Sequence, residues 1–209
     1  MIDQLLASYK SVIVLDGAIE QILPFVRKEV IWIAADGAGD RVEAHYVVGD
    51  GDSRKDQGEK KFIYRPNQNA TDFEKCLGWA EEIGALPSLV IGISGGEIDH
   101  VLGNLQLLLK YARQQSLFFL DSFPGGMKIG IPLEKGSYQF KVGKKSKVSF
   151  IPFSCCQLST KGLKWELHDQ QLTPEGLLAI RNQGVEEPFE VLIDSGKVLL
   201  IVDCFSMGE

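Results

Sequence analysis

The stretch VIWIAADGAGDRVEAHYVVGDGDS (residues 30–53) contains two runs of β-forming residues, and each run is followed closely by aspartate and glycine. Short apolar runs bounded by turn residues are typical of strands that are buried on both faces. Asp36 follows the first run, and Asp50 and Asp52 follow the second. The stretch therefore predicts buried strands that end in acidic loops.

The same pattern extends through the first half of the chain. Helix-like segments alternate with the β-forming runs, which favours a mainly parallel sheet in an α/β fold. The clearest helix begins at Thr71, which has capping-box spacing to Glu74, and ends near Gly84; a second helix spans about 99–115. The runs are VIVL (12–15), VIWIAA (30–35), HYVVG (45–49), KFIYR (61–65), SLVIGIS (88–94) and LFFLD (117–121).

After SFPGG (122–126) the β-forming runs continue, but no long helical pattern separates them. This half is typical of an antiparallel sandwich or barrel. We therefore expect an α/β domain at 1–122 and an all-β domain at 126–209, and we interpret the basic run 141–147 as a solvated hairpin turn. The runs are KIGI (128–131), YQFKV (138–142), KVSFIPF (147–153), EVLIDS (190–195) and KVLLIV (197–202).

Composition narrows the classes of function. The chain has 209 residues and a net charge of -6, so binding to nucleic acid or to an anionic membrane has little electrostatic support. No apolar run is long enough to span a bilayer, and the N-terminus is acidic where a signal peptide would be basic. The four cysteines show no C-x-x-C spacing. We expect a cytoplasmic protein with reduced thiols.

The acidic loops all follow strands of the predicted parallel sheet. Because such strands end at one edge, we expect Asp16, Asp36, Asp50 and Asp52 to converge there with the turn at 94–96. Two carboxylates about 4 Å apart repel by roughly 4 kcal/mol at an effective dielectric constant of 20, so a cluster requires a cation. Mg²⁺ prefers such hard oxygen ligands. The alternative is that each aspartate only completes its own turn or caps a helix.

A competing motif is GISGG (92–96), which fits the G-x-S-x-G pattern of a hydrolase nucleophile elbow. Ser94 would then need a later histidine, and only His100 and His168 follow it. That hypothesis leaves the aspartates without a role. We interpret the segment as a glycine turn that lets backbone approach a ligand.

Seven segments, in their order and spacing, resemble those of the thiamine pyrophosphokinase family. The resemblance implies an α/β catalytic domain that binds nucleotide and a β-sandwich domain that binds thiamine and forms a homodimer. It also implies ATP-dependent transfer of a diphosphoryl group to the hydroxyl of thiamine, with release of AMP. The segments are AADGAGDRV (34–42), VGDGDS (48–53), NQNATDFEKCL (67–77), GISGGEIDHVLGNLQLL (92–108), TKGLKWEL (160–167), AIRNQG (179–184) and GKVLLIV (196–202).

The resemblance also implies roles for single residues. Trp165 and Asn182 occupy the thiamine positions, although from the residues alone Trp165 would be a core residue of the β domain. The expected ligands of Mg²⁺ are Asp36, Asp50, Asp52 and Asp72; the last three are also the catalytic carboxylates, with Asp72 the candidate general base. Besides Asp36, the residues expected to contact ATP or to order its loops are Gly37, Ser53, Gln68, Thr71, Ser94, Gly95, Asp99, His100 and Asn104. His100 has the alternative role of a packed helix residue.

Three positions depart from the family pattern. Glu97 stands where many members have arginine, Arg181 where they have serine, and Asp40 where they often have asparagine. Arg54, Lys55 or Arg181 are candidates for the missing phosphate-binding charge. Two alternatives therefore stay open: a diphosphokinase that acts on another alcohol such as a hydroxymethylpterin, and an inactive homologue that binds nucleotide or metal.

Overall fold

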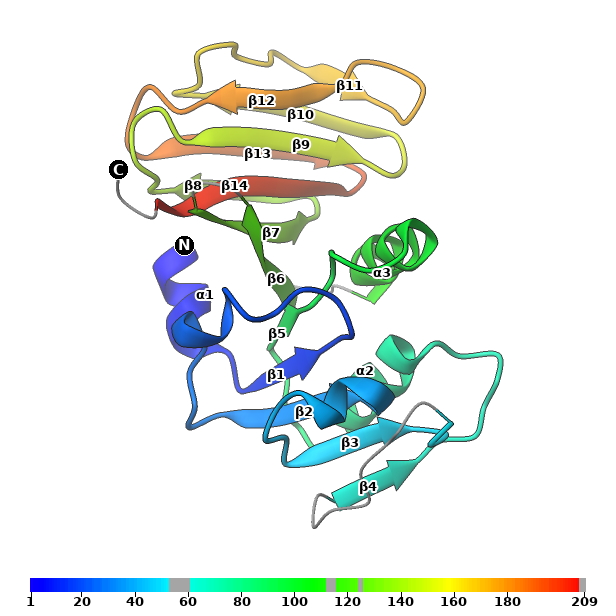
Figure 1. Cartoon of the computed structure of the whole chain (residues 1–209). Coiled ribbons are helices and arrows are strands. Elements are labelled where there is room, and N and C mark those ends of the chain that lie inside the picture. Colours follow the sequence, from blue (N-terminus) through cyan, green and yellow to red (C-terminus); the bar gives the residue numbers. More distant parts are fainter. Residues whose placement is uncertain (53–60, 112–115, 124–125, 207–209) are drawn as a thin grey trace. The chain divides into compact units, whose positions relative to one another are not determined.

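The computed structural model describes residues 1–52, 61–111, 116–123 and 126–206, and the side chains of these residues up to 204. The chain forms two compact units (Figure 1). The first, here called the N-terminal unit, contains Ser8–Leu107 and Phe119–Asp121. The second, the C-terminal unit, contains Met1–Ala7, Leu108–Phe118 and the chain from Ser122 onward.

A parallel sheet forms the centre of the N-terminal unit. Its strands lie in the order β5-β1-β2-β3-β4, and each neighbouring pair is parallel. Residues Phe119–Asp121 of β6, the next strand beyond β5, complete this unit. The strands are β1 (Ser11–Val14), β2 (Ile31–Ala35), β3 (Tyr46–Gly49), β4 (Lys61–Tyr64), β5 (Ser88–Ile91) and β6 (Leu117–Phe123).

The central strands of this sheet are apolar throughout because both of their faces are covered. All four residues of β1 are buried, as are all four of β5. Such strands are typical of parallel sheets with helices on both sides. The helix α2 (Asp72–Glu82) packs against β1, β2 and β3. It begins with the predicted capping box at Thr71, and Gly84 follows its end with a φ of +65°.

Among the other helices of the described chain, one was predicted and three short ones were not. The helix α3 (Ile98–Tyr111) begins one residue before the predicted start, and 112–115 lie outside the described residues. The sequence did not predict α1 (Ile2–Ser8) or the 3₁₀ helices η1 (Leu23–Phe25) and η2 (Asp36–Asp40). Each is too short to show a helical period of apolar residues.

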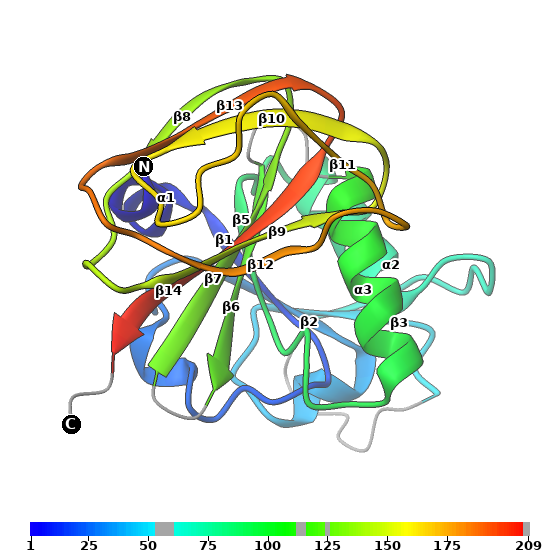
Figure 2. The ribbon, with the colours of Figure 1, turned by 90° about the horizontal axis from the view of Figure 1, so that it is seen from above.

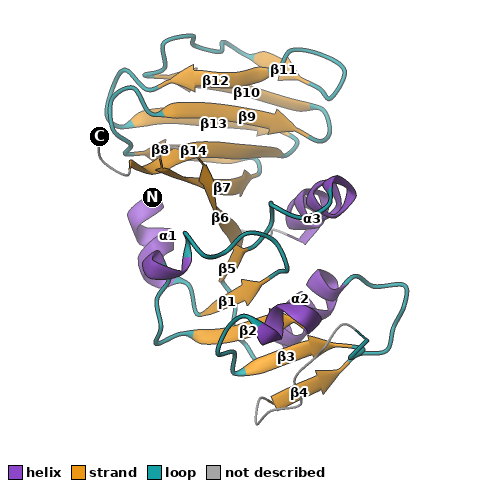
Figure 3. Cartoon of the chain, viewed as in Figure 1, coloured by secondary structure: helices purple, strands orange, loops and turns teal. Residues whose placement is uncertain are grey.

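Two sheets face each other in the C-terminal unit, as Figure 2 shows from above. One has the order β12-β9-β14-β7 and the other β11-β10-β13-β8, and the paired strands are antiparallel (Figure 3). Alternate residues such as Val148 and Phe150 on β9 are fully buried. The strands are β7 (Gly126–Leu133), β8 (Gly136–Phe140), β9 (Lys147–Pro152), β10 (Cys156–Lys161), β11 (Gln170–Leu172), β12 (Ala179–Gln183), β13 (Phe189–Ser195) and β14 (Val198–Ser206).

The basic run 141–147 forms a turn, but the prediction of a hairpin was wrong. Ser146 N donates to Gly143 O at 3.0 Å, and Lys145 has a φ of +75°. The run joins β8 to β9, which belong to different sheets, so the turn is a crossover between the layers. A basic, glycine-containing run predicts a reversal of the chain, whereas the pairing of its flanking strands depends on distant segments.

The fold class is confirmed: a mainly parallel α/β half precedes an antiparallel β half. Within the described ranges, every helix is too short or too polar to cross a membrane.

Candidate active site

Three aspartates from two neighbouring loops meet at the carboxyl edge of the parallel sheet. Asp36 begins η2 directly after β2, and Asp50 and Asp52 follow β3. One carboxylate oxygen from each lies within 4.8 Å of the others. Asp36 is buried, with 1% of its surface exposed, whereas Asp52 is exposed. The cluster therefore has a buried end and an end that is open to a ligand.

Gly49 allows this close approach. A Cβ atom at position 49 would lie 2.7 Å from Asp36 Cβ and 2.8 Å from Asp36 Oδ2, which is closer than any side chain tolerates. The next loop then reaches back, because Gly51 N donates to Asp36 Oδ2 at 3.0 Å. The end of β3 thus orients the buried carboxylate.

The first turn of α2 adds a fourth carboxylate and a buried cation. Lys75 Nζ lies 2.8 Å from Asp72 Oδ1 and 3.5 Å from Asp50 Oδ2. Burial of Lys75 lowers its pKa, but the hydrogen bond and charge of Asp72, with the charge of Asp50, outweigh this and raise the pKa above its ordinary value. Asp72 is thereby linked to the cluster through Lys75. It is not among the three aspartates whose oxygens lie together.

Asp50 is held as an anion by its neighbours. Gln68 Nε2 donates to Asp50 Oδ2 at 2.6 Å, and Asp52 N donates to Asp50 Oδ1 at 3.4 Å. The hydrogen bond from Gln68 is the largest influence that lowers the pKa of Asp50, and the hydrogen bond from Asp52 and the charge of Lys75 add to it against partial burial. An ionised carboxylate is the form that binds a metal. Gln68, expected at the nucleotide, here contacts the cluster.

Thr71 uses its side chain to begin α2. Its Oγ1 accepts from Glu74 N at 3.2 Å, and Thr71 N donates to Glu74 Oε2 at the same distance. This capping box fixes the first turn, from which Asp72 projects. The cap accounts for Thr71 structurally, and a contact with nucleotide stays a prediction.

A second pair of loops meets beyond β1. Gly17 N donates to Gly92 O at 3.0 Å and Ala18 N to Ser94 O at 2.7 Å. The strands β2, β3 and β4 are added in turn on one side of β1, and β5 is added on its other side. The strand order therefore reverses between β1 and β5. Ligands of open α/β sheets bind at such a reversal.

Ser94 donates its hydroxyl to Asp121, with 2.7 Å between Oγ and Oδ1. A nucleophile elbow needs a histidine to take this proton, whereas here the proton points to a carboxylate. The hydrolase hypothesis gains no support from this geometry. Sequence reasoning missed Asp121, although the residue ends the predicted run LFFLD.

Asp16 does not join the other carboxylates. Its Oδ1 lies 3.3 Å from Arg41 Nη1, and its side chain is 79% exposed. Arg41 also donates to Gly17 O at 2.8 Å and pairs with Glu20 at 2.6 Å. The expectation that Asp16 joins the cluster was therefore wrong: the group consists of the three aspartates from the loops after β2 and β3, and Asp16 pairs with Arg41 instead. Arg41 lies in the segment AADGAGDRV (34–42), but no role was predicted for it from the sequence.

The other predicted nucleotide residues lie on loops and on α3. His100 is exposed, which removes the alternative of a packed helix residue, and Asn104 follows one turn later. Asp99 Oδ1 accepts from His100 N at 2.9 Å. Gly37 lies in η2, and Gly95 has a φ of +89° in the loop after β5. Ser53, like Arg54 and Lys55, lies outside the described residues.

The predicted thiamine residues lie together in the C-terminal unit. Trp165 is 57% exposed, so the expectation of a core residue was wrong, whereas Asn182 is 6% exposed. Trp165 N donates to Asn182 Oδ1 at 3.2 Å, and Asn182 Nδ2 donates to Trp165 O at 2.6 Å. Lys164 Nζ lies 4.6 Å from the centre of the indole ring. Arg181, at a bulge of β12, is exposed and has a φ of +57°.

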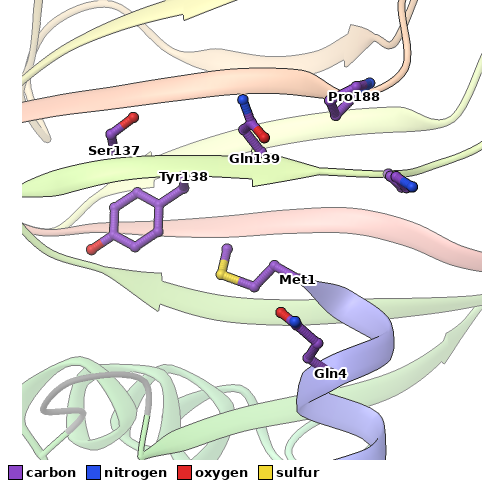
Figure 4. A pocket seen from close by; sticks show the side chains of 7 residues that line it. Met1, Gln4, Ser137, Tyr138, Gln139 and Pro188 are labelled. Carbon is purple, nitrogen blue, oxygen red and sulfur yellow. The ribbon is translucent and has the colours of Figure 1, made fainter.

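A separate cavity of about 390 Å³ lies in the C-terminal unit between α1 and the β8 region (Figure 4). None of the predicted site residues lines it. Its lining residues are Met1, Gln4, Ser137, Tyr138, Gln139, Lys141 and Pro188.

Comparison with known proteins assigns the chain to a family. Residues 2–120 match the model described as "Thiamin pyrophosphokinase, catalytic domain". Residues 128–198 match "Thiamin pyrophosphokinase, vitamin B1 binding domain". The chain belongs to the thiamin pyrophosphokinase family. The predicted family and the prediction of an enzyme are confirmed.

Relatives of this family resemble the chain along most of its length. Thiamine pyrophosphokinase of Bacillus subtilis is 27% identical over 194 residues, which cover 83% of this chain and 89% of that protein. The crystal structure of thiamin pyrophosphokinase from Geobacillus thermodenitrificans has a TM-score of 0.78 at 22% identity, and 94% of this chain and 98% of that chain are covered. The yeast structure has a TM-score of 0.77 at 15% identity, with 98% and 90% covered. These structures show the fold.

Proposed function

We propose that the protein transfers a diphosphoryl group from ATP to the hydroxyl of thiamine and releases AMP. The observation that carries the proposal is the group of Asp36, Asp50 and Asp52, with ligand oxygens within 4.8 Å, in a chain whose two halves match both domains of the family. Diphosphoryl transfer needs charge neutralisation and positioning more than covalent catalysis. The clustered carboxylates suit that requirement.

Mg²⁺ is the metal that we propose for this cluster. Carboxylate oxygens are its preferred ligands, and the exposed side of Asp52 leaves room for phosphate oxygens. Asp36, Asp50 and Asp52 would hold the ion, with Asp72 as a further candidate. When bound, Mg²⁺ neutralises the charge that the carboxylates and the phosphates of ATP would otherwise bring together.

Asp72 is the proposed general base. Its side chain is 39% exposed, so a substrate hydroxyl can reach it, and Lys75 holds its Oδ1. The alcohol oxygen attacks the β-phosphorus, its proton passes to the carboxylate, and the bond to AMP breaks. Asp50 and Asp52 are the other proposed catalytic carboxylates, and they would hold the metal ion beside the same reacting group.

The nucleotide contacts remain those expected from the motifs. We propose that the loops after β2 and β5 and the first turns of α2 and α3 surround ATP. The proposed contacts are Asp36, Gly37, Ser53, Gln68, Thr71, Ser94, Gly95, Asp99, His100 and Asn104.

Thiamine is the acceptor that we propose for Trp165. Trp165 is exposed, and an indole ring offers the electron-rich surface that a thiazolium cation prefers, as the approach of Lys164 Nζ to within 4.6 Å of the ring centre illustrates. We assign nucleotide binding and catalysis to 1–122, and thiamine binding and homodimer formation to 126–209. The match of 128–198 to the vitamin B1 binding domain supports the thiamine assignment. The four cysteines show no C-x-x-C spacing, which favours reduced thiols, and we propose the cytoplasm.

The test is an assay of AMP release by the purified protein with ATP and Mg²⁺, with and without thiamine. We expect AMP only when thiamine is present, and loss of turnover in folded Asp52→Asn. Asp194→Asn, which changes an exposed aspartate in the C-terminal unit, is the matched control and should keep full activity. AMP release with a hydroxymethylpterin instead would assign a different acceptor. ATP binding without turnover on either alcohol would indicate an inactive homologue.

A further inference from the structure

Lys75 is a buried cation within an acidic cluster. Its side chain is 6% exposed, and those of its partners Asp50 and Asp72 are 13% and 39% exposed. Lysine is almost never buried to this degree unless it is paired, because removing an ammonium group from water is costly. The two carboxylates therefore account for its position, and Lys75 in turn offsets their repulsion.

Asp50 belongs to two arrangements at once. It is one of the three aspartates with converging oxygens, and its Oδ2 also lies 3.5 Å from Lys75 Nζ. A divalent ion held by Asp50 would share that carboxylate with the ammonium group. Two cations near one carboxylate repel each other and divide its charge.

We propose that Lys75 is the resident counter-cation of the cluster, which stabilises the carboxylates of Asp50 and Asp72 without metal and weakens the binding of a divalent ion. The proposal rests on the metal site of the proposed function. Lys75 is a positioning residue in this role, since it acts through the two aspartates.

The geometry of α2 fixes the position of Lys75 relative to Asp72. Asp72 and Lys75 are three residues apart on α2 and so lie on one side of its first turn. The capping box at Thr71 fixes that turn. The ammonium group is thus presented to Asp50 by a rigid element, and its charge is present before any metal arrives.

The first test measures the affinity for Mn²⁺ alone, without nucleotide, by electron paramagnetic resonance of the free ion. Lys75→Met removes the charge and keeps the length of the side chain, and we expect it to bind Mn²⁺ about tenfold more tightly than the wild type. Lys75→Arg keeps the charge, so its affinity for Mn²⁺ should remain close to that of the wild type. Lys197→Met removes a lysine that pairs with Glu134 in the other unit, and should change nothing.

Unchanged or weaker Mn²⁺ binding by Lys75→Met would overturn the proposal, as would Lys75→Arg behaving like Lys75→Met. Absence of Mn²⁺ binding by both the wild type and Lys75→Met, or binding that persists in Asp52→Asn, would instead refute the metal site itself. The two failures are therefore distinguishable.

The second test measures thermal unfolding in EDTA and in saturating Mn²⁺. In EDTA we expect Lys75→Met to unfold at a lower temperature than Lys197→Met, because its carboxylates repel without compensation. Mn²⁺ should close most of that gap. A Lys75→Met protein that is unfolded in both media would overturn the proposal, since a bound cation must be able to replace a counter-cation.

Discussion

The buried side chain of Asn182 binds both backbone polar groups of Trp165: its Oδ1 accepts from Trp165 N, and its Nδ2 donates to Trp165 O. Trp165 as a whole is 57% exposed. A buried amide that holds the backbone of an exposed aromatic residue is the arrangement expected where that residue must be presented to a ligand. Asn182 therefore fixes the backbone of Trp165, the residue proposed to bind thiamine.

Asn182→Ala should raise KM for thiamine and leave KM for ATP nearly unchanged. The substitution unpairs the N–H and C=O groups of Trp165, and we expect a loss of about 1–3 kcal/mol in the free energy of unfolding. Thiamine-dependent AMP release at saturating ATP measures the first effect, and urea unfolding the second. Asn182→Asp keeps the acceptor for Trp165 N. Its KM for thiamine and its free energy of unfolding should lie between those of Asn182→Ala and the wild type. An unchanged KM for thiamine in a folded Asn182→Ala protein would show that Trp165 needs no such support.

Gly49→Ala should disrupt the acidic cluster. The added methyl group would lie 2.7 Å from Asp36 Cβ, so the buried aspartate or the end of β3 must move. We expect a loss of roughly 1–3 kcal/mol in stability and a large loss of AMP release.

Gly78→Ala is the matched control for that substitution. Gly78 lies inside α2 with open space where its Cβ would be, so alanine should stabilise the protein by about 0.5–1 kcal/mol. Chemical denaturation of both variants tests the pair. Equal stability of the two proteins would contradict the close approach of Gly49 to Asp36.

Thr71→Ala should weaken the start of α2. Loss of the cap is expected to reduce the free energy of unfolding by about 0.5–2 kcal/mol. Turnover should fall as well, because the first turn orients Asp72. Thr71→Ser keeps the capping oxygen and should retain most of the stability in urea unfolding. If serine proved as destabilising as alanine, the methyl group of Thr71, and not its hydroxyl group, would be what stabilises the start of α2.

The cysteines should differ sharply in reactivity. Burial raises the pKa of the Cys76 thiol and raises that of Cys156 to about 11, whereas Cys155 is exposed. The thiolate is the reactive form, so a thiol reagent at pH 8 should modify Cys155 first and leave Cys76 until the protein unfolds. Mass spectrometry of the modified native protein tests the order. Cys155→Ser should remove the fast phase, and a fast phase that survived in this variant would contradict the assignment.

Local patterns predicted most of the fold. The runs at 12–15 and 88–94 became strands because parallel strands covered on both faces must be apolar throughout. Thr71 and Glu74 predicted the start of α2 because a capping box needs only contacts within one turn. By contrast, the sequence did not predict the strands β10 and β12. Both carry several polar residues, and neither contains a continuous apolar run.

The site was predictable only in part. Strand-end aspartates predicted the cluster of Asp36, Asp50 and Asp52, since the sheet brings these ends to one edge. The sequence did not predict the contact of Lys75 with Asp50, which joins a helix to a loop 25 residues away. Nor did it predict the ion pair between Arg41 and Asp16. Such side-chain pairings depend on tertiary geometry, for which a sequence motif has no signal.

The four proposed metal carboxylates all belong to the N-terminal unit, between Asp36 and Asp72, whereas Trp165 and Asn182 belong to the C-terminal unit. On the proposed assignment of thiamine to Trp165, mutagenesis around this residue is the route to new acceptor alcohols. Such libraries would leave all four of these carboxylates of the N-terminal unit unaltered.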